Sequence, residues 1–158
     1  MEVIPLCNIR IDKEGAWYYG EEEIFRREIV LLFYENLKQD QSGRYLIELG
    51  DEKCYVEVED TPFVVKSVNH TLSEGDNGEA IYLYLSDGTV EVLDPGTLYV
   101  GKDNVLYCTI RSKAFKARFS RASYYQIAHY IENDFKNDTY FISLNGKSFY
   151  IKKSLENC

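Results

Sequence analysis

Hydrophobic and polar residues alternate along much of the chain, a pattern typical of half-buried β-strands. Tyr45, Ile47 and Leu49 show it most clearly, and a turn at 50–53 leads into a second strand at 54–58. Further strands are expected at 63–68, 80–85, 90–93 and 98–100. Ser86-Asp87-Gly88 and Asn145-Gly146 are expected to form hairpin turns, because these residue types tolerate positive φ.

Two stretches instead carry hydrophobic residues at helical spacing, and they predict helices at about 26–37 and 121–135. The second is the clearer of the two, with a single apolar stripe made of Tyr124, Ile127, Ala128, Ile131 and Phe135. Ser120 is the expected N-cap of this helix, since its hydroxyl can accept a hydrogen bond from an amide of the first turn.

The chain also resembles itself. Phe119-Ser120-Arg121 follows Phe25-Arg26-Arg27 by 94 residues, and the strand pattern at 45–49 recurs 95 residues later. Residues 13–18 resemble residues 102–107, so the second copy carries five extra residues before its helix. We therefore predict an α+β fold with an internal duplication, in which each of two lobes has a small, mainly antiparallel sheet with one helix packed across it.

The expected lobes are residues 1–76 and 77–158, because the stretch at 72–79 has the composition of a linker. The N-terminal residues lack the pattern of a signal peptide, and no apolar run approaches the length of a membrane span. These features predict a cytoplasmic protein without a membrane partner.

Charge and cysteine content narrow the possible functions. The 158 residues carry a formal net charge of −8, which argues against broad coating of nucleic acid. The four cysteines (Cys7, Cys54, Cys108 and Cys158) are widely separated and there are only two histidines, so we expect no metal site, no disulfide and no cofactor.

The net charge hides a basic segment. Residues 104–131 contain no Asp or Glu and carry a formal +5, which leaves −13 on the rest of the chain. One interpretation is a solvated basic edge strand matched by the acidic residues at 57–60. The other is a surface that binds a negatively charged partner.

Arg27 and Arg121 occupy equivalent positions in the first turn of the two helices, where a positive side chain opposes the helix dipole. A nearby anion would remove this conflict. The anion could be an internal carboxylate, from Glu57 or Asp60, or a small acidic ligand. The sequence contains no nucleophile elbow, phosphate-binding glycine loop or zinc-binding helix, which favours a non-catalytic protein without deciding the question.

Several stretches resemble the bacterial domain-of-unknown-function family 1285. They are residues 11–18, 25–28, 43–45, 56–65 and 117–125, and the resemblance extends over about residues 8–153. It implies a soluble, duplicated two-lobe α+β protein with no assigned reaction, for which ligand binding and signalling roles have been suggested. The residues that it carries over as ligand contacts are Arg27, Glu57, Asp60, Phe63, Arg118, Arg121 and Tyr124.

The leading hypothesis is a non-catalytic ligand-binding or regulatory module with an anion-preferring site near the cleft between the lobes. Arg118 and Arg121 would hold the anion, and Tyr124 would form an aromatic wall. The alternative is a protein-interaction module that presents the basic segment and exposed sheet edges to an acidic protein. Local nucleic-acid binding is a third reading, which the expected burial of Phe115 and Phe119 disfavours.

Overall fold

The computed structural model describes residues 3–72 and 78–153. The chain divides into two compact units, Met1–Pro62 (unit 1) and Phe63–Cys158 (unit 2). The lobe boundary expected after residue 76 lies outside the described residues. Among those residues, no helix has the length and apolar character needed to cross a membrane.

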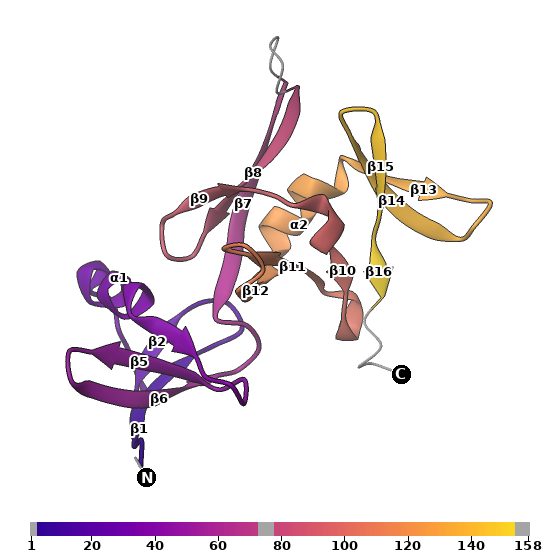
Figure 1. Ribbon diagram of the computed structural model, residues 1–158. Helices are drawn as coiled ribbons and strands as arrows, with labels where there is room; N and C mark the ends of the chain where they lie inside the picture. Colours follow the sequence, from indigo (N-terminus) through magenta and orange to yellow (C-terminus); the bar gives the residue numbers. More distant parts are fainter. Residues whose placement is uncertain (1–2, 73–77, 154–158) are drawn as a thin grey trace. The chain divides into compact units, whose positions relative to one another are not determined.

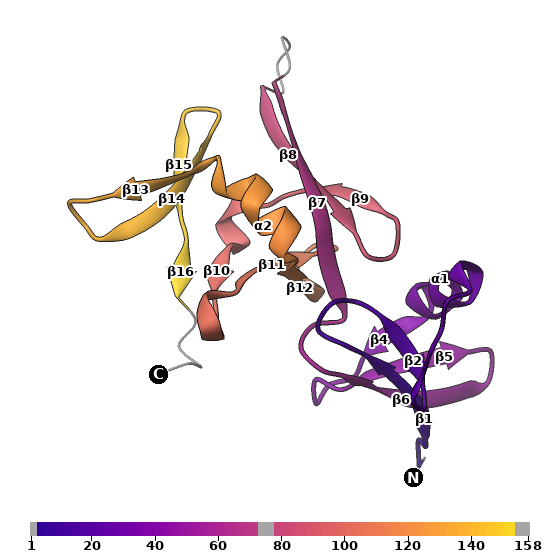
Figure 2. The same ribbon diagram turned by 180° about the vertical axis from the view of Figure 1, so that it is seen from behind.

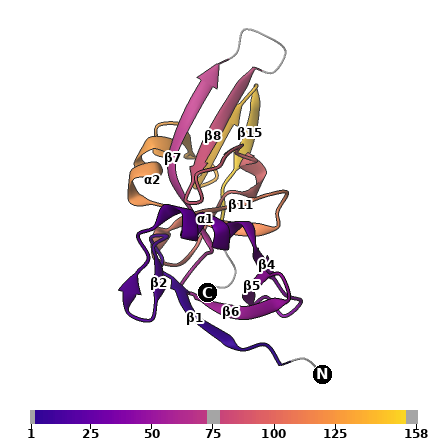
Figure 3. The ribbon, with the colours of Figure 1, turned by 90° about the vertical axis from the view of Figure 1, so that its left-hand side faces the viewer.

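Unit 1 contains one six-stranded sheet and one helix, α1 (Arg27–Glu35), which lies across a face of the sheet (Figure 3). The strand order is β3-β2-β1-β6-β5-β4, and only the pairing of β1 with β6 is parallel. The strands are β1 (Leu6–Ile11), β2 (Trp17–Tyr19), β3 (Glu22–Glu23), β4 (Leu37–Gln39), β5 (Tyr45–Leu49) and β6 (Glu52–Val58).

Unit 2 contains two sheets (Figure 1). The seven-stranded sheet has the order β16-β10-β11-β12-β7-β8-β9, built from β7 (Phe63–Leu72), β8 (Glu79–Leu85), β9 (Val90–Val92), β10 (Tyr99–Val100), β11 (Leu106–Ile110), β12 (Phe115–Phe119) and β16 (Lys152–Lys153). The three-stranded sheet has the order β13-β14-β15, built from β13 (Ile131–Asp134), β14 (Thr139–Leu144) and β15 (Lys147–Tyr150). Helix α2 (Arg121–Ala128) and two short 3₁₀ turns, η1 (Pro95–Thr97) and η2 (Lys102–Asn104), complete the unit.

The fold thus combines helices and sheets, with strands in the majority. The expectation of one small, mainly antiparallel sheet per lobe needs correction. Unit 1 has a single sheet with a parallel pair at its centre, whereas unit 2 has two sheets and further parallel pairs, β10 with β16 and β12 with β7. Non-local parallel pairing is invisible in hydrophobic alternation, which reports faces and not neighbours.

Residues 6–58 (segment N) and residues 95–153 (segment C) place strands and an α-helix in the same order and pair them in the same register. Ile11 lies opposite Trp17 in segment N, and Val100 lies opposite Leu106 in segment C, each 89 positions further along. Later pairs are shifted by 94 or 95 positions: Leu37 opposite Ile47 and Ile131 opposite Ile142, then Leu46 opposite Tyr55 and Phe141 opposite Tyr150.

An Asp–Tyr hydrogen bond also occurs at matching places in the two segments. The Tyr55 hydroxyl donates to Asp40 at 2.9 Å, and the Tyr150 hydroxyl donates to Asp134 at 3.2 Å. The hydrogen bond from the Ser42 hydroxyl, with help from Tyr55 and nearby amides, lowers the pKa of Asp40 from 3.8 to about 2. Hydrogen bonds, that from the Asn137 side chain foremost, also lower the pKa of Asp134.

The two segments differ at strand β6, the central strand of segment N, and at its counterpart in segment C. In segment N, β6 runs unbroken between β5 and β1 and joins the two halves into one sheet. In segment C the equivalent stretch is interrupted at Ile151, so that β15 pairs with β14 and β16 pairs with β10. The two halves of segment C therefore belong to different sheets.

The helices of the two segments bury different faces. Helix α1 buries Val30 and Tyr34, whereas α2 buries Ser123 and Ile127. Helix α2 lies alongside β7 (Figure 2), and the Ser123 hydroxyl donates to the Val65 carbonyl at 2.7 Å. Packing on β7, which has no counterpart in segment N, thus selects an adjacent stripe of the helix surface.

The sequence predicted the beginning of α2 correctly and its end wrongly. Ser120 is confirmed as the N-cap, because its hydroxyl accepts from the Ser123 amide at 3.1 Å. The helix expected to reach 135 ends at Ala128, and Ile131 begins β13 instead. Pairing with β14 and the turn anchored by Asp134, which accepts from two following amides, outweigh the helical spacing of the apolar residues.

The predicted hairpin turns at Asn145-Gly146 and at 86–88 are confirmed by β14–β15 and β8–β9. The prediction that no disulfide forms is wrong. Cys7 of β1 and Cys54 of β6 are bonded, because the parallel pairing of these strands brings their Cα atoms to 4.9 Å despite a sequence separation of 47.

Candidate functional site

A cavity in segment C lies beside one face of α2. This face is equivalent to the face that α1 buries in segment N. Tyr124 and Ala128 are equivalent to Val30 and Tyr34, and both line a cavity of about 890 Å³. The other apolar residues of its wall are Val100, Leu106, Ile131 and Ile151. The strands and the helix that close a core in segment N therefore surround an open space in segment C.

Aromatic side chains fill the same place in segment N. The Trp17 ring lies 4.8 Å from that of Tyr34 in an edge-on arrangement, and both side chains are 1% exposed. By the strand register and the helix offset, segment C has Leu106 in place of Trp17 and Ala128 in place of Tyr34. The loss of two large rings removes the material that would fill the core.

A second pocket, of about 280 Å³, adjoins this cavity and shares Tyr124 with it. Arg118 of β12 and Arg121, the first residue of α2, line it together with Asp103 of η2. Three predicted site residues, Arg118, Arg121 and Tyr124, are thus brought together within unit 2. Arg121 makes no ion pair and no side-chain hydrogen bond with any residue in the described ranges.

The cavity wall also carries polar groups. Asn104, Asn133, Asp138, Thr139, Tyr140 and Lys153 line it. The Thr139 hydroxyl oxygen is buried and finds no hydrogen-bond partner within residues 3–72 and 78–153. Buried hydroxyls are normally paired, so this one has a hydrogen bond available to a guest.

The remaining predicted site residues lie elsewhere. Arg27 begins α1, Glu57 lies on β6 and Asp60 follows β6, all with exposed side chains in unit 1. Phe63 begins β7 in unit 2 and is fully buried, with its ring 5.2 Å from that of Phe115. Phe63 is therefore a core residue, and a part in ligand contact stays a prediction for the other three.

Arg111 of the basic segment points into the fold. Its guanidinium donates to Asp87, whose side chain is only 4% exposed, and lies 4.6 Å from the centre of the Phe63 ring. Its backbone amide donates to the Glu91 carboxylate at 3.1 Å. Arg111 thus neutralises a buried carboxylate, and Asp87 and Glu91 are the acidic residues that contact it.

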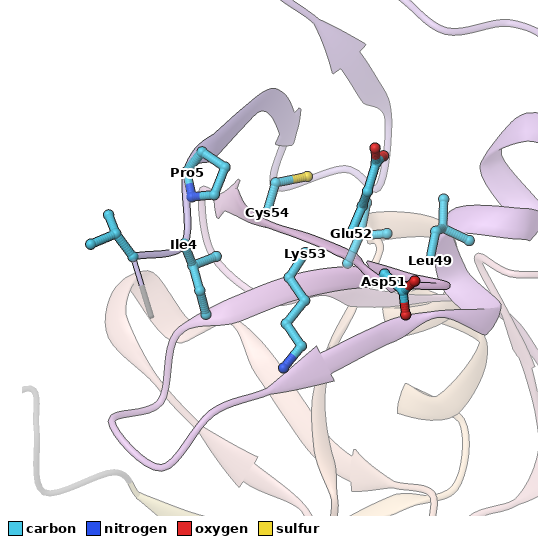
Figure 4. Close-up of a pocket in the computed structure, with 9 residues that line it drawn as sticks. Ile4, Pro5, Leu49, Asp51, Glu52, Lys53 and Cys54 are labelled. Atoms are coloured by element: carbon cyan, nitrogen blue, oxygen red, sulfur yellow. The ribbon is translucent and has the colours of Figure 1, made fainter. Parts of the chain in front are cut away.

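Unit 1 has a pocket of its own, of about 450 Å³, between the N-terminal residues and β6 (Figure 4). Ile4 and Pro5 lie on one side, and Cys54, whose sulfur is bonded to Cys7, lies on the other. Asp51, Glu52 and Lys53 carry charges of both signs around it. Within the described parts of the chain, no cluster of three His, Cys, Asp or Glu side chains is arranged to hold a metal ion.

Comparison with known proteins gives a family match for the N-terminal part of the chain and a fold for most of it. Residues 2–61 match the family model "Domain of unknown function (DUF1285), N-terminal domain". A DUF1285 family protein from Silicibacter pomeroyi has a similar structure, with a TM-score of 0.75 and 22% identity over 92% of this chain and 80% of that one. A DUF1285 family protein from Shewanella baltica gives a TM-score of 0.61 and 21% identity over 80% of this chain and 92% of that one.

No curated protein sequence matches the chain. The two structural likenesses support the fold, and the family model supports the N-terminal domain. The resemblance inferred from the sequence is thereby confirmed: residues 2–61 match the DUF1285 N-terminal domain, and two DUF1285 family proteins share the fold over most of the chain.

Proposed function

We propose that this protein is a non-catalytic ligand-binding module of regulatory type, and that unit 2 holds its anion-preferring site. The observation that carries the proposal is the cavity of segment C, which occupies the place of the aromatic core of segment N. A space bounded by secondary structure, with an apolar wall and a few polar groups, has the character of a small-molecule site.

Arg118 and Arg121 favour an anionic group on the ligand. Both line the pocket that adjoins the cavity, and Arg121 lies at the N-terminus of α2, where the helix dipole also favours negative charge. The Arg121 guanidinium has no partner in the described ranges, so it can bind a carboxylate or phosphate through two parallel hydrogen bonds. Tyr124, which borders both spaces, would contact the body of the ligand.

The proposal includes an internal duplication as the origin of the site. Matching strand registers and the recurring Asp–Tyr hydrogen bonds in segments N and C support it. In this view one copy kept its core filled, and the other exchanged the core aromatics for smaller side chains and became a receptor.

A thermal-shift screen of nucleotides, phosphates and carboxylates tests the function. At a hundredfold excess over Kd, a true ligand is expected to raise the Tm by roughly 5 °C or more. Arg121→Ala should remove the shift by removing the anion contact, and Ala128→Tyr should remove it by restoring the ring that segment N has at this position.

Lys136→Ala, which removes an exposed cation from the β13–β14 turn, is the matched control and should keep the full shift. A panel in which no compound raises the Tm would contradict the proposal. So would a shift caused by a carboxylate or a monophosphate that survives both Arg121→Ala and Ala128→Tyr.

A protein-interaction role is the second candidate, and the edge strand β9 favours it. Val90 and Val92 expose about half of their surface at the outer edge of the seven-stranded sheet, where backbone groups are open to pairing. A pull-down that recovers one acidic protein would support this role if Val92→Glu, which adds a negative charge to this edge, abolishes the recovery while the variant remains folded. Unchanged recovery would count against it.

A further inference from the structure

One pocket occurs twice in the molecule, at equivalent places in segments N and C. The pocket of segment N has a volume of about 150 Å³, and that of segment C about 410 Å³. At the offsets set by the strand registers, five lining positions coincide: Asn8 with Thr97, Ile9 with Leu98, Arg10 with Tyr99, Gly20 with Thr109, and Glu57 with Lys152.

The pocket of segment N is lined by one positive and one negative side chain. Arg10 of β1 and Glu57 of β6 are register partners, so a cation and a carboxylate share its wall. The Arg10 guanidinium also lies 4.2 Å from the centre of the Tyr18 ring. A pocket of this size with balanced charges has no preference for an ion of either sign.

The pocket of segment C carries charge of one sign only. Tyr99 and Lys152 replace the Arg10–Glu57 pair in the same register. Lys153 of β16, Lys116 of β12 and Lys113 of the β11–β12 turn join Lys152 around the hollow. Among residues 3–72 and 78–153, no acidic residue lines it. None of the four lysines forms an ion pair or a side-chain hydrogen bond with any residue that the structure describes.

Two threonines add hydroxyl groups to this hollow. Thr97 is engaged, because its hydroxyl donates to the Asp94 carbonyl at 2.8 Å and accepts from the Thr109 amide at 3.2 Å. The Thr109 hydroxyl oxygen is buried and has no partner among residues 3–72 and 78–153. A buried hydroxyl without a partner is uncommon, and it is an independent sign of a missing polar guest.

We propose that the lysine pocket of segment C binds a small molecule that carries two or more phosphate groups. Lysine ammonium groups act as compact point charges. They therefore suit a cluster of phosphate oxygens better than they suit a single planar carboxylate. Four of them around one hollow repel one another, and one polyanion of matching charge removes that repulsion. The pocket is also within the size range of small-ligand sites.

This pocket uses other cations than the anion site proposed above: Arg118, Arg121 and Tyr124 do not line it, although Lys153 lines both it and the cavity of segment C. Titration calorimetry with inorganic tripolyphosphate tests it, with sulfate at the same ionic strength for comparison. Tripolyphosphate should bind, and sulfate should not. Lys152→Glu, which restores the charge that segment N has at this position, should weaken tripolyphosphate binding at least tenfold.

Lys136→Glu makes the same change of charge on an exposed lysine of β13–β14 and should alter the Kd less than twofold. Arg121→Ala should also leave it unchanged, which separates this site from the proposed anion site. Lys153→Glu provides a second variant of the pocket, and the far-ultraviolet circular dichroism of each variant shows that it folds.

Absence of tripolyphosphate binding would overturn the proposal, as would equal Kd values for Lys152→Glu and Lys136→Glu. Equally tight, Lys152-dependent binding of single-stranded RNA or of polyglutamate would overturn the small-molecule assignment, because it would make the pocket part of a general polyanion surface.

Discussion

Segments N and C share a strand register but differ in what that register encloses. In segment N an unbroken β6 closes one sheet under α1, and Trp17 and Tyr34 fill the space between them. In segment C the equivalent strand is interrupted at Ile151 and the equivalent space is a cavity. The comparison shows that strand pairing and core closure are separable, because two segments with the same register differ in whether large side chains fill the core.

The two segments also differ in how their charged side chains are arranged. In segment N a cation and a carboxylate, Arg10 and Glu57, lie opposite each other in the register of β1 and β6. Segment C leaves Arg121 and four lysines without partners in the described ranges, around two separate hollows. An unfilled core and cations without partners in the same segment support the proposal that segment C holds the binding sites.

The largest expected effect comes from giving segment N the smaller residue of segment C. Tyr34→Ala should lower the free energy of unfolding of unit 1 by roughly 3–5 kcal/mol, because it leaves a cavity beside Trp17. Urea unfolding followed by tryptophan fluorescence reports on this unit selectively, since Trp17 is the single tryptophan of the chain.

Segment C already has alanine at the position equivalent to Tyr34, so the comparison there is Tyr124→Ala, at the position equivalent to the buried Val30. Tyr124 is 40% exposed, so its truncation should cost no more than about 0.5 kcal/mol. Equal losses for Tyr34→Ala and Tyr124→Ala would refute the contrast between a filled and an open segment.

The second effect concerns the Cys7–Cys54 disulfide of segment N. The equivalent positions of segment C hold Gly96 and Phe149, which cannot form one. Replacing Cys7 and Cys54 together by serine should lower the stability of unit 1 by roughly 2–4 kcal/mol, because the bond constrains a long loop in the unfolded chain. Urea unfolding with and without dithiothreitol measures it, and the double serine variant should not respond to the reductant.

A wild-type protein that is equally stable with and without reductant would show that the bond contributes nothing. The oxidation state of these cysteines in cells also bears on the expected cytoplasmic location, because thiols are kept reduced there. Intact-mass measurement after alkylation distinguishes the two states.

The third effect is the smallest and tests the feature that the segments share. The hydrogen bonds of Asp40 keep its folded pKa near 2, below the 3.8 of an unperturbed carboxyl. Their contribution to stability is therefore complete above pH 3.8 and is lost as the pH falls through about 2. Carbon-13 NMR titration of the Asp40 carboxyl should show this low midpoint.

Tyr55→Phe should raise the pKa of Asp40, and Tyr150→Phe should raise that of Asp134, because each removes a donor to the carboxylate. A titration midpoint that does not move in either variant would mean that the tyrosines do not hold these carboxylates.

Much of the local structure could be predicted from the sequence. The hairpin at Asn145-Gly146 and the Ser120 cap depend on residues within a few positions of one another, and local chemistry determines them. The end of α2 could not be predicted in this way, because Ile131 and Phe135 continue the helical spacing while pairing with β14 makes the segment a strand.

The candidate sites divide in the same manner. Arg118, Arg121 and Tyr124 lie close together in the sequence, and they line one pocket. Lys152 and Lys153 were missed because nothing near them in the chain connects them with Lys113 and Lys116. The parallel pairing of β10 with β16 places them around the same hollow. Self-similarity at offsets of 89 and 95 was the one signal that could have led from Glu57 to Lys152.

The sequence by itself determined the strand-rich pattern, the turns, the helix cap and the family resemblance, because each depends on short-range alternation or on local hydrogen bonding. The tertiary structure alone decided the Cys7–Cys54 bond and the pairing of Arg111 with Asp87. It also decided the large cavity and the lysine pocket of segment C. These features join residues tens of positions apart, and only non-local strand pairing and the volume of facing side chains determine which of them meet.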